Sequence, residues 1–195
     1  MRKSFSSVFI SKPAVVVDLD DTLIHVTPLP PKNLDNNNFF TICIKRRRLY
    51  VQMRPHLREF LERVSKLFDV YFFTSSTADY ADPIIDKIIP NKKEYCRLYR
   101  DSCLNMHGYY VKDLKIIKRP LRQTLLIDDS AGSALVNPKN LVRIKPWYGE
   151  KDDTVLNDLS KILESIAFEN DLRLSFTEAI KDGNFEGITT FYISN

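Results

Sequence analysis

The chain has few cysteines, no long apolar run and little net charge, and each shortage excludes a class of protein. Its three cysteines among 195 residues are an odd number without C-x-x-C spacing, which favours free thiols in a reducing compartment over a disulfide framework. Three histidines far apart in the sequence make zinc a poor fit. No apolar run approaches the roughly 18 residues that span a membrane, and the basic, polar N-terminus is unlike a secretion signal. We expect a nuclear or cytoplasmic protein without a membrane partner.

The net charge of +4, from 29 basic and 25 acidic residues, is too small to indicate direct binding to nucleic acid. The one dense basic run is Lys45-Arg46-Arg47-Arg48. It is explained first by a solvated hairpin turn or tip, and the alternative, a patch that attracts an anionic partner such as a multiply phosphorylated one, stays open.

The pattern of apolar residues predicts one α/β domain. An apolar content of 44% suits a single core, and strand-like runs alternate with helical patterns, which is typical of a parallel sheet. The helical patterns cover residues 56–68, 78–89 and 154–168, and strand-like runs include 15–17, 69–73, 97–100, 125–127 and 141–144. We expect an N-terminal extension over residues 1–12, the domain over 13–168, and a C-terminal tail over 169–195, in which the part from Ser175 has no clear place in the fold.

Two further strand-like runs, at residues 39–44 and 49–53, flank the basic run and predict a β-hairpin. The hairpin belongs to a small β insertion of about residues 28–53 after the first strand. Because loops and insertions on a rigid scaffold commonly carry specificity, we expect this one to help select the substrate.

Carboxylates follow two of the apolar runs directly. Asp18 and Asp20 follow the first, and Asp128 and Asp129 follow Leu125-Leu126-Ile127. One such pair is also an ordinary turn or helix cap, but two pairs at neighbouring parallel strand ends would converge. Like charges 4 Å apart repel by roughly 4 kcal/mol at an effective dielectric near 20, so a cation is implied. Oxygen-only ligation favours Mg²⁺.

Other polar groups complete a set suited to phosphoryl transfer through an aspartyl phosphate. Thr74 and Ser75 end another strand-like run, and Lys112 follows in the sequence. One aspartate can then act as nucleophile and the other handle protons, while the hydroxyls and the ammonium group bind phosphoryl oxygens.

These motifs resemble those of the haloacid dehalogenase superfamily and, within it, the small phosphatases of the RNA polymerase II C-terminal domain. The resemblance covers about residues 13–168. Its local matches are Asp18–Leu23, Arg54–His56, Phe73–Ser75, Tyr80–Pro83, Arg100–Cys103, Tyr110–Leu114 and Leu126–Ser130. It implies a Rossmann-like three-layer fold with a central parallel sheet and a small β-hairpin or β-sheet insertion. Receiver domains also combine acidic pairs with Thr or Ser and Lys, but in the reverse order.

The resemblance also implies residue roles. Asp18 would attack phosphorus, Asp20 would give and take a proton, and Thr74 and Lys112 would contact the phosphoryl group. Mg²⁺ would be held by Asp18, the backbone carbonyl of Asp20 and Asp129, with Asp128 beside it. The implied substrate contacts are Thr22, Ser75, Tyr80, Arg100, Ile42, Ile44 and Leu49.

We therefore expect a Mg²⁺-dependent phosphoserine/phosphothreonine protein phosphatase, with the polymerase tail as substrate. A different phosphoprotein, such as a lipid-metabolism regulator, and a non-catalytic phosphopeptide-binding scaffold are the alternatives. The chain departs from the family pattern at Asp21, commonly Glu, and at Asp129, commonly Asn. Pro28 and Thr77 replace an aromatic residue and a leucine in the pocket that grips proline, which weakens the expected preference for pSer-Pro.

Overall fold

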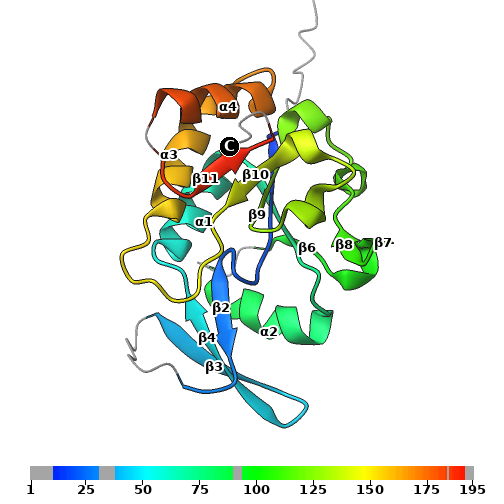
Figure 1. Ribbon diagram of the computed structural model, residues 1–195, viewed down its shortest axis with the longest axis vertical. Helices are drawn as coiled ribbons and strands as arrows, with labels where there is room; N and C mark the ends of the chain where they lie inside the picture. The colour runs from blue at the N-terminus through cyan, green and yellow to red at the C-terminus, as the bar shows by residue number, and fades with distance from the viewer. Residues whose placement is uncertain (1–10, 31–37, 90–93, 184, 192–195) are drawn as a thin grey trace, which may run out of the picture.

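The computed structural model describes residues 11–30, 38–89, 94–183 and 185–191. Most of the expected N-terminal extension and residues 31–37 of the expected insertion lie outside this part. At the centre is a six-stranded sheet in the order β11-β10-β9-β1-β5-β6 (Figure 1). Its strands are β1 (Ala14–Val17), β5 (Asp69–Phe73), β6 (Cys96–Leu98), β9 (Thr124–Asp128), β10 (Leu141–Ile144) and β11 (Ile188–Thr190). All pairs are parallel except β10 with β11.

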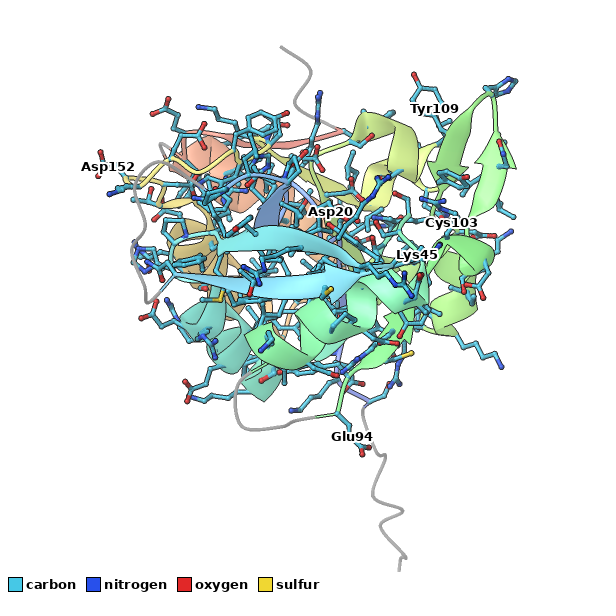
Figure 2. The ribbon with its side chains drawn as sticks, turned by 90° about the horizontal axis from the view of Figure 1, so that it is seen from below. Asp20, Lys45, Glu94, Cys103, Tyr109 and Asp152 are labelled. Atoms are coloured by element: carbon cyan, nitrogen blue, oxygen red, sulfur yellow. The ribbon has the colours of Figure 1, made fainter. Side chains whose placement is uncertain are left out.

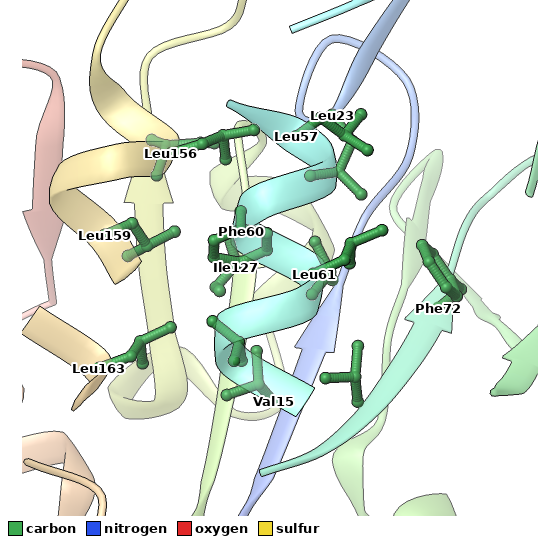
Figure 3. Packing of buried hydrophobic residues seen from close by; sticks show 14 of the residues in the cluster. Val15, Leu23, Leu57, Phe60, Leu61, Phe72, Ile127, Leu156, Leu159 and Leu163 are labelled. Atoms are coloured by element: carbon green, nitrogen blue, oxygen red, sulfur yellow. The ribbon is translucent and has the colours of Figure 1, made fainter. Parts of the chain in front are cut away.

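Alternate side chains of β1 face two different cores, as the two-residue period of a strand requires. Val15 and Val17 face the larger core, while Ala14 and Val16 face a smaller one. Helices α1 (Leu57–Leu67), α2 (Ala78–Ile88), α3 (Val155–Ile166) and α4 (Leu172–Asp182) contribute to the larger core. Figure 3 shows side chains of α1 and α3 in this core. The smaller core is covered by short 3-10 helices, mainly η3 (Leu114–Ile117) and η5 (Ala131–Ala134). The predicted α/β fold with a central, mostly parallel sheet is confirmed.

Helix α1 shows how the sequence sets this packing. Leu57, Phe60, Leu61 and Val64 recur at helical spacing, and all four are at most 2% exposed. This stripe lies between the sheet and α3 (Figure 3). Burying each such side chain contributes about 1.5–3 kcal/mol before the entropy cost of ordering it.

The predicted hairpin in the insertion is β3 (Phe39–Ile44) with β4 (Arg47–Met53), and β2 (Ile24–Thr27) adds a third antiparallel strand. The first two basic residues, Lys45 and Arg46, form the turn with positive φ angles of 47° and 65°. The side of this small sheet that carries Ile42 packs on α2.

A second hairpin was not predicted. It consists of β7 (Leu104–Met106) and β8 (Tyr109–Val111). Its two turn residues, His107 and Gly108, have φ angles of 51° and 84°, as in the type I′ turns that suit two-residue hairpins. The other 3-10 helices among the described residues are η2 (Arg100–Ser102), η4 (Leu121–Gln123) and η6 (Pro138–Asn140). The strand predicted at residues 97–100 therefore ends earlier, because Arg100 begins η2.

The segment from Ser175, which the sequence pattern left unassigned, has a definite place in the fold. Phe176 of α4 is fully buried in the larger core, and β11 adds an antiparallel edge to the central sheet. In the described part of the chain, no helix combines the length and apolar character needed to cross a membrane.

Candidate active site

The two carboxylate motifs meet at the edge where the parallel strands end. Val17 pairs with Ile127, and the N–H of Asp18 continues this pairing by donating to the Ile127 carbonyl at 3.0 Å. The side chains of Asp18 and Asp128 are therefore brought together, and the residues are only 7% and 1% exposed. The convergence predicted from the sequence is present in the structure.

Lys112 lies between these two carboxylates. Its Nζ donates to Asp18 Oδ1 at 2.5 Å and to Asp128 Oδ2 at 2.6 Å, and the residue is 2% exposed. Burial raises the pKa of Asp18 to about 8, with Lys112 opposing the change and Asp128 adding to it. Burial also opposes the charge of Lys112, but the two carboxylates outweigh it and raise the Lys112 pKa. When both acids are ionised, the two carboxylates outnumber the one ammonium group and the cluster carries a net negative charge.

Asp129 adds a third carboxylate beside this cluster. The Thr22 hydroxyl donates to Asp129 Oδ1 at 3.2 Å and accepts from the Asp129 N–H at 3.2 Å. One oxygen each from Asp18, Asp128 and Asp129 lies within 4.8 Å of the others. An all-oxygen set of this kind fits a hard divalent cation such as Mg²⁺. The Asp20 side chain is not in the set, consistent with a role for its backbone carbonyl instead.

The carboxylate of Asp20 accepts hydrogen bonds from two hydroxyl groups, one in the loop after β5 and one in helix α2. Tyr80 donates to Oδ1 at 2.5 Å, and Ser76 donates to Oδ2 at 2.9 Å. Burial raises the pKa of Asp20, while these two hydrogen bonds act against the rise. Burial and the Asp20 charge raise the pKa of Tyr80, so its hydroxyl stays a donor. A fixed carboxylate with a raised pKa suits proton transfer.

Two of these contacts differ from what the sequence indicated. Tyr80 was expected to contact the substrate, and the structure places its hydroxyl on Asp20. Ser76 was not among the predicted site residues. Its only sequence signal was its place within the hydroxyl run, residues 74–77, that follows β5.

The loop after β5 carries the predicted hydroxyl groups. Thr74 is 1% exposed, and its hydroxyl accepts from the Ser76 N–H at 3.0 Å. Arg100 fixes the same loop, because its Nε donates to the Ser75 carbonyl at 2.7 Å and its N–H to the Ser76 carbonyl at 2.9 Å. Arg100 was expected to contact the substrate, and the structure gives it a bracing role in this loop.

A buried pair supports the turn after Asp20. Arg54 binds Asp153 through two hydrogen bonds of 2.8 Å and donates from Nη1 to the Thr22 carbonyl at 3.0 Å. Arg54 is 1% exposed. The sequence flagged Arg54 only as part of a matching motif, and it gave no signal for Asp153.

These groups border a cavity of about 320 Å³. It is lined by Asp18, Asp20, Asp21, Ser75, Gly108, Tyr109, Tyr110, Lys112, Asp128, Asp129, Ser130 and Ser133. Figure 2 labels Asp20 and Tyr109, which come from the β1 and β8 sides of this site. Among the residues described, the predicted contacts Ile42, Ile44 and Leu49 do not line it. They pack in or against the larger core, and their role with substrate stays a prediction.

Comparison with known proteins gives one consistent match. Residues 13–173 match the family model described as NLI interacting factor-like phosphatase. A probable C-terminal domain small phosphatase of Dictyostelium discoideum is 37% identical over 165 residues, covering 85% of this chain and 54% of the relative. The human CTD small phosphatase-like protein is 38% identical over 161 residues, covering 83% of this chain and 58% of the relative. The yeast Phosphatase PSR1 is 35% identical over 161 residues, covering 83% of this chain and 38% of the relative.

Among solved structures, that of Fcp1, an essential RNA polymerase II CTD phosphatase, is similar with a TM-score of 0.57 at 22% identity, covering 89% of this chain and 54% of that one. The structure of fission yeast Fcp1 gives a TM-score of 0.56 at 18% identity, covering 94% of this chain and 59% of that one. These likenesses support the fold. The chain spans only 54% and 58% of the length of the first two curated relatives.

Proposed function

Because the chain belongs to the NLI interacting factor-like phosphatase family, which matches residues 13–173, we propose that it is a Mg²⁺-dependent phosphoserine/phosphothreonine protein phosphatase. The observation that carries this proposal is the buried group of Asp18, Lys112 and Asp128 beside the fixed carboxylate of Asp20. Several relatives are named as small phosphatases of the RNA polymerase II C-terminal domain. We propose that tail as the substrate, which would place the protein in the nucleus.

In the first step, an Asp18 oxygen attacks phosphorus and the bond from phosphorus to the substrate serine oxygen breaks. The departing oxygen takes a proton from Asp20, which is needed because a serine alkoxide is a poor leaving group. Burial raises the pKa of Asp20 and so favours its protonated form. The product of this step is an aspartyl phosphate on Asp18 and a free serine hydroxyl.

In the second step, Asp20 takes a proton from water as the water oxygen attacks phosphorus. Inorganic phosphate leaves and Asp18 is restored as a carboxylate. The hydroxyls of Tyr80 and Ser76 hold Asp20 in place while it is ionised. Lys112 offsets negative charge on Asp18 and on the phosphoryl group, and Thr74 and Ser75 supply polar groups from the loop after β5.

Asp18, Asp129 and the backbone carbonyl of Asp20 would hold Mg²⁺, with Asp128 beside it. The fit rests on the three carboxylate oxygens within 4.8 Å of one another and on the excess of carboxylates over the single ammonium group of Lys112. When bound, the ion supplies positive charge that offsets the charge of the phosphoryl oxygens.

The test is hydrolysis of a small aryl phosphate in Mg²⁺ and in EDTA. We expect Asp18→Asn to lower kcat/KM by at least about 10³-fold, which corresponds to roughly 4 kcal/mol of transition-state stabilisation. Asp182→Asn makes the same chemical change at an exposed position at the end of α4 and should leave the rate unchanged. Activity that survives EDTA or Asp18→Asn would refute the proposed mechanism.

The choice of protein substrate needs a separate test. The residues that the resemblance assigns to proline binding do not line the described cavity, and one relative is named only as Phosphatase PSR1. Turnover should therefore be compared for polymerase-tail phosphopeptides and other phosphopeptides, with and without a following proline. Equal turnover of all peptides would count against the polymerase tail as the preferred substrate, and binding without turnover would indicate a scaffold.

A further inference from the structure

Two tyrosines of β8 border the catalytic cavity without any part in the proposed chemistry. Tyr109 is 53% exposed and Tyr110 is 39% exposed. Both line the cavity together with Asp18 and Asp128. We refer to Tyr109 and Tyr110 as the aromatic wall.

The aromatic wall has a fixed position relative to the catalytic lysine. The type I′ turn at His107 and Gly108 sets the hairpin, and the next residue after the wall, Val111, is fully buried. The N–H of Lys112 then donates to the Ser133 carbonyl at 2.7 Å. These contacts fix the β7–β8 hairpin next to Lys112, whose ammonium group contacts Asp18.

Each ring of the wall has its own support. A Cβ placed on Gly132 would lie 2.3 Å from Tyr109 Cδ1, so the Tyr109 ring occupies space that only a glycine leaves free. The Tyr110 ring lies under the guanidinium of Arg100, 5.0 Å from the ring centroid to Cζ. Arg100 in turn donates to the Ser75 carbonyl at 2.7 Å. The wall is thus braced against both neighbouring loops of the cavity.

The wall is also the large apolar surface of this cavity. Among the described lining residues there are five aspartates, three serines, one lysine and one glycine besides the two tyrosines. The contacts that the resemblance assigns to the insertion, Ile42, Ile44 and Leu49, are not among the described lining residues, and Ile42 is only 6% exposed and packs in the larger core. Figure 1 shows β7 and β8 on a different side of the strand ends from the β2–β4 sheet.

We propose that the aromatic wall binds the peptide that flanks the phosphorylated side chain, with an apolar neighbouring residue lying on the Tyr109 ring. This inference rests on the proposed phosphatase function, since the phosphoryl group would occupy the polar floor of the same cavity. Five carboxylates in the lining disfavour an acidic residue at that position. Tyrosine offers a large rigid contact surface at low entropic cost.

The first experiment compares two substrates in the variant Tyr109→Ala. For a phosphopeptide with leucine next to phosphoserine, we expect KM to rise about tenfold while kcat stays within about twofold. For a small fluorinated alkyl phosphate, which has no ring or peptide, kcat/KM should stay unchanged. Tyr109→Phe should retain the wild-type KM, and a peptide with glutamate in place of leucine should bind less well and lose its sensitivity to Tyr109→Ala.

Two further variants distinguish loss of the Tyr109 contact with the peptide from a general effect on folding. Gly132→Ala leaves both tyrosines in the sequence but displaces the Tyr109 ring, so it should raise the peptide KM while leaving turnover of the alkyl phosphate unchanged. Phe168→Ala removes an 89% exposed aromatic side chain that does not line the cavity, and it should change neither substrate. Equal effects of Tyr109→Ala on both substrates, or none on the peptide, would overturn the proposal.

A binding measurement keeps this inference distinct from the proposed function. In an Asp18→Asn background, the Kd of the leucine phosphopeptide should rise about tenfold on adding Tyr109→Ala. If the wild-type protein hydrolyses neither substrate, the proposed function fails, and the Kd ratio still decides the inference. An unchanged Kd would overturn it whatever the activity.

Discussion

In the part of the chain that the structure describes, two ionic groups are buried, and one of the two is balanced in charge. Arg54 forms an ion pair with a single carboxylate, that of Asp153, through two hydrogen bonds. Its guanidinium group makes a third hydrogen bond, to the Thr22 carbonyl. Lys112 lies instead between two carboxylates and beside a third, that of Asp129. Thr22 touches both groups, through its carbonyl and through its hydroxyl.

This difference in charge balance distinguishes a structural ion pair from a functional cluster. A balanced, fully hydrogen-bonded pair needs nothing more and holds two loops together. An unbalanced cluster with a raised pKa is costly unless a cation joins it, and such clusters concentrate at functional sites. We therefore expect the balanced pair to govern folding stability and the unbalanced cluster to govern metal binding and turnover.

The largest expected effect on stability is at the balanced pair. Arg54→Ala leaves Asp153 without a charge partner and the Thr22 carbonyl without a donor, which should lower the free energy of unfolding by about 3–5 kcal/mol. Urea unfolding measures this. Arg63→Ala is the matched control, because its partner Glu164 is 37% exposed, and it should cost less than about 1 kcal/mol. Similar losses in both variants would contradict a special role for the buried pair.

A smaller effect should follow from adding Mg²⁺ to the unbalanced cluster. Because the proposed ion would bind the folded protein and not the unfolded chain, the thermal midpoint should rise with Mg²⁺, by the equivalent of about 2.7 kcal/mol at one hundred times Kd. Asp129→Asn removes one of the three nearby carboxylates, and it should shift this dependence to higher Mg²⁺ concentrations. The midpoint of Asp182→Asn should respond as wild type does. An identical Mg²⁺ dependence in Asp129→Asn would exclude that carboxylate as a ligand.

The smallest expected effect is at an exposed pair. Arg63 lowers the pKa of Glu164, so the pair stabilises the folded state above the ordinary glutamate pKa near 4.5, and this stability is lost as the pH falls through the lowered value. Glu164→Gln should cost at most about 0.5 kcal/mol at pH 7, because solvent screens the pair. The difference from wild type should vanish in urea unfolding at acidic pH. A difference that persists there would indicate a contribution from packing.

The features that were predicted correctly from the sequence are those that depend on local patterns of apolar and polar residues. The apolar runs before Asp18 and Asp128 indicated strands, and parallel pairing then implied that their ends meet. Lys112 was included as the ammonium group of the phosphoryl-transfer set, but its place between Asp18 and Asp128 could not be predicted from sequence spacing. The phosphoryl roles of Thr74 and Lys112 stay predictions.

The sequence could not predict contacts that depend on the folded chain. Asp153 reaches Arg54 across 99 positions, and Ser76 reaches Asp20 across 56, with no local signal for either pairing. Strand β11 is only three residues long, too short to show a period, and it is specified by pairing with β10. The aromatic wall was missed because a His-Gly turn is a weak hairpin signal compared with Asn-Gly or Asp-Gly.

The most direct test of the central claim is to trap the phosphorylated enzyme. Wild-type protein mixed with a phosphopeptide and Mg²⁺ would be quenched in acid within one turnover, digested, and analysed by mass spectrometry. We predict one phosphoryl group on the peptide that contains Asp18, present in wild type and absent from Asp18→Asn. Turnover of the phosphopeptide with no phosphoryl group on Asp18, or with the group on another residue, would contradict the account.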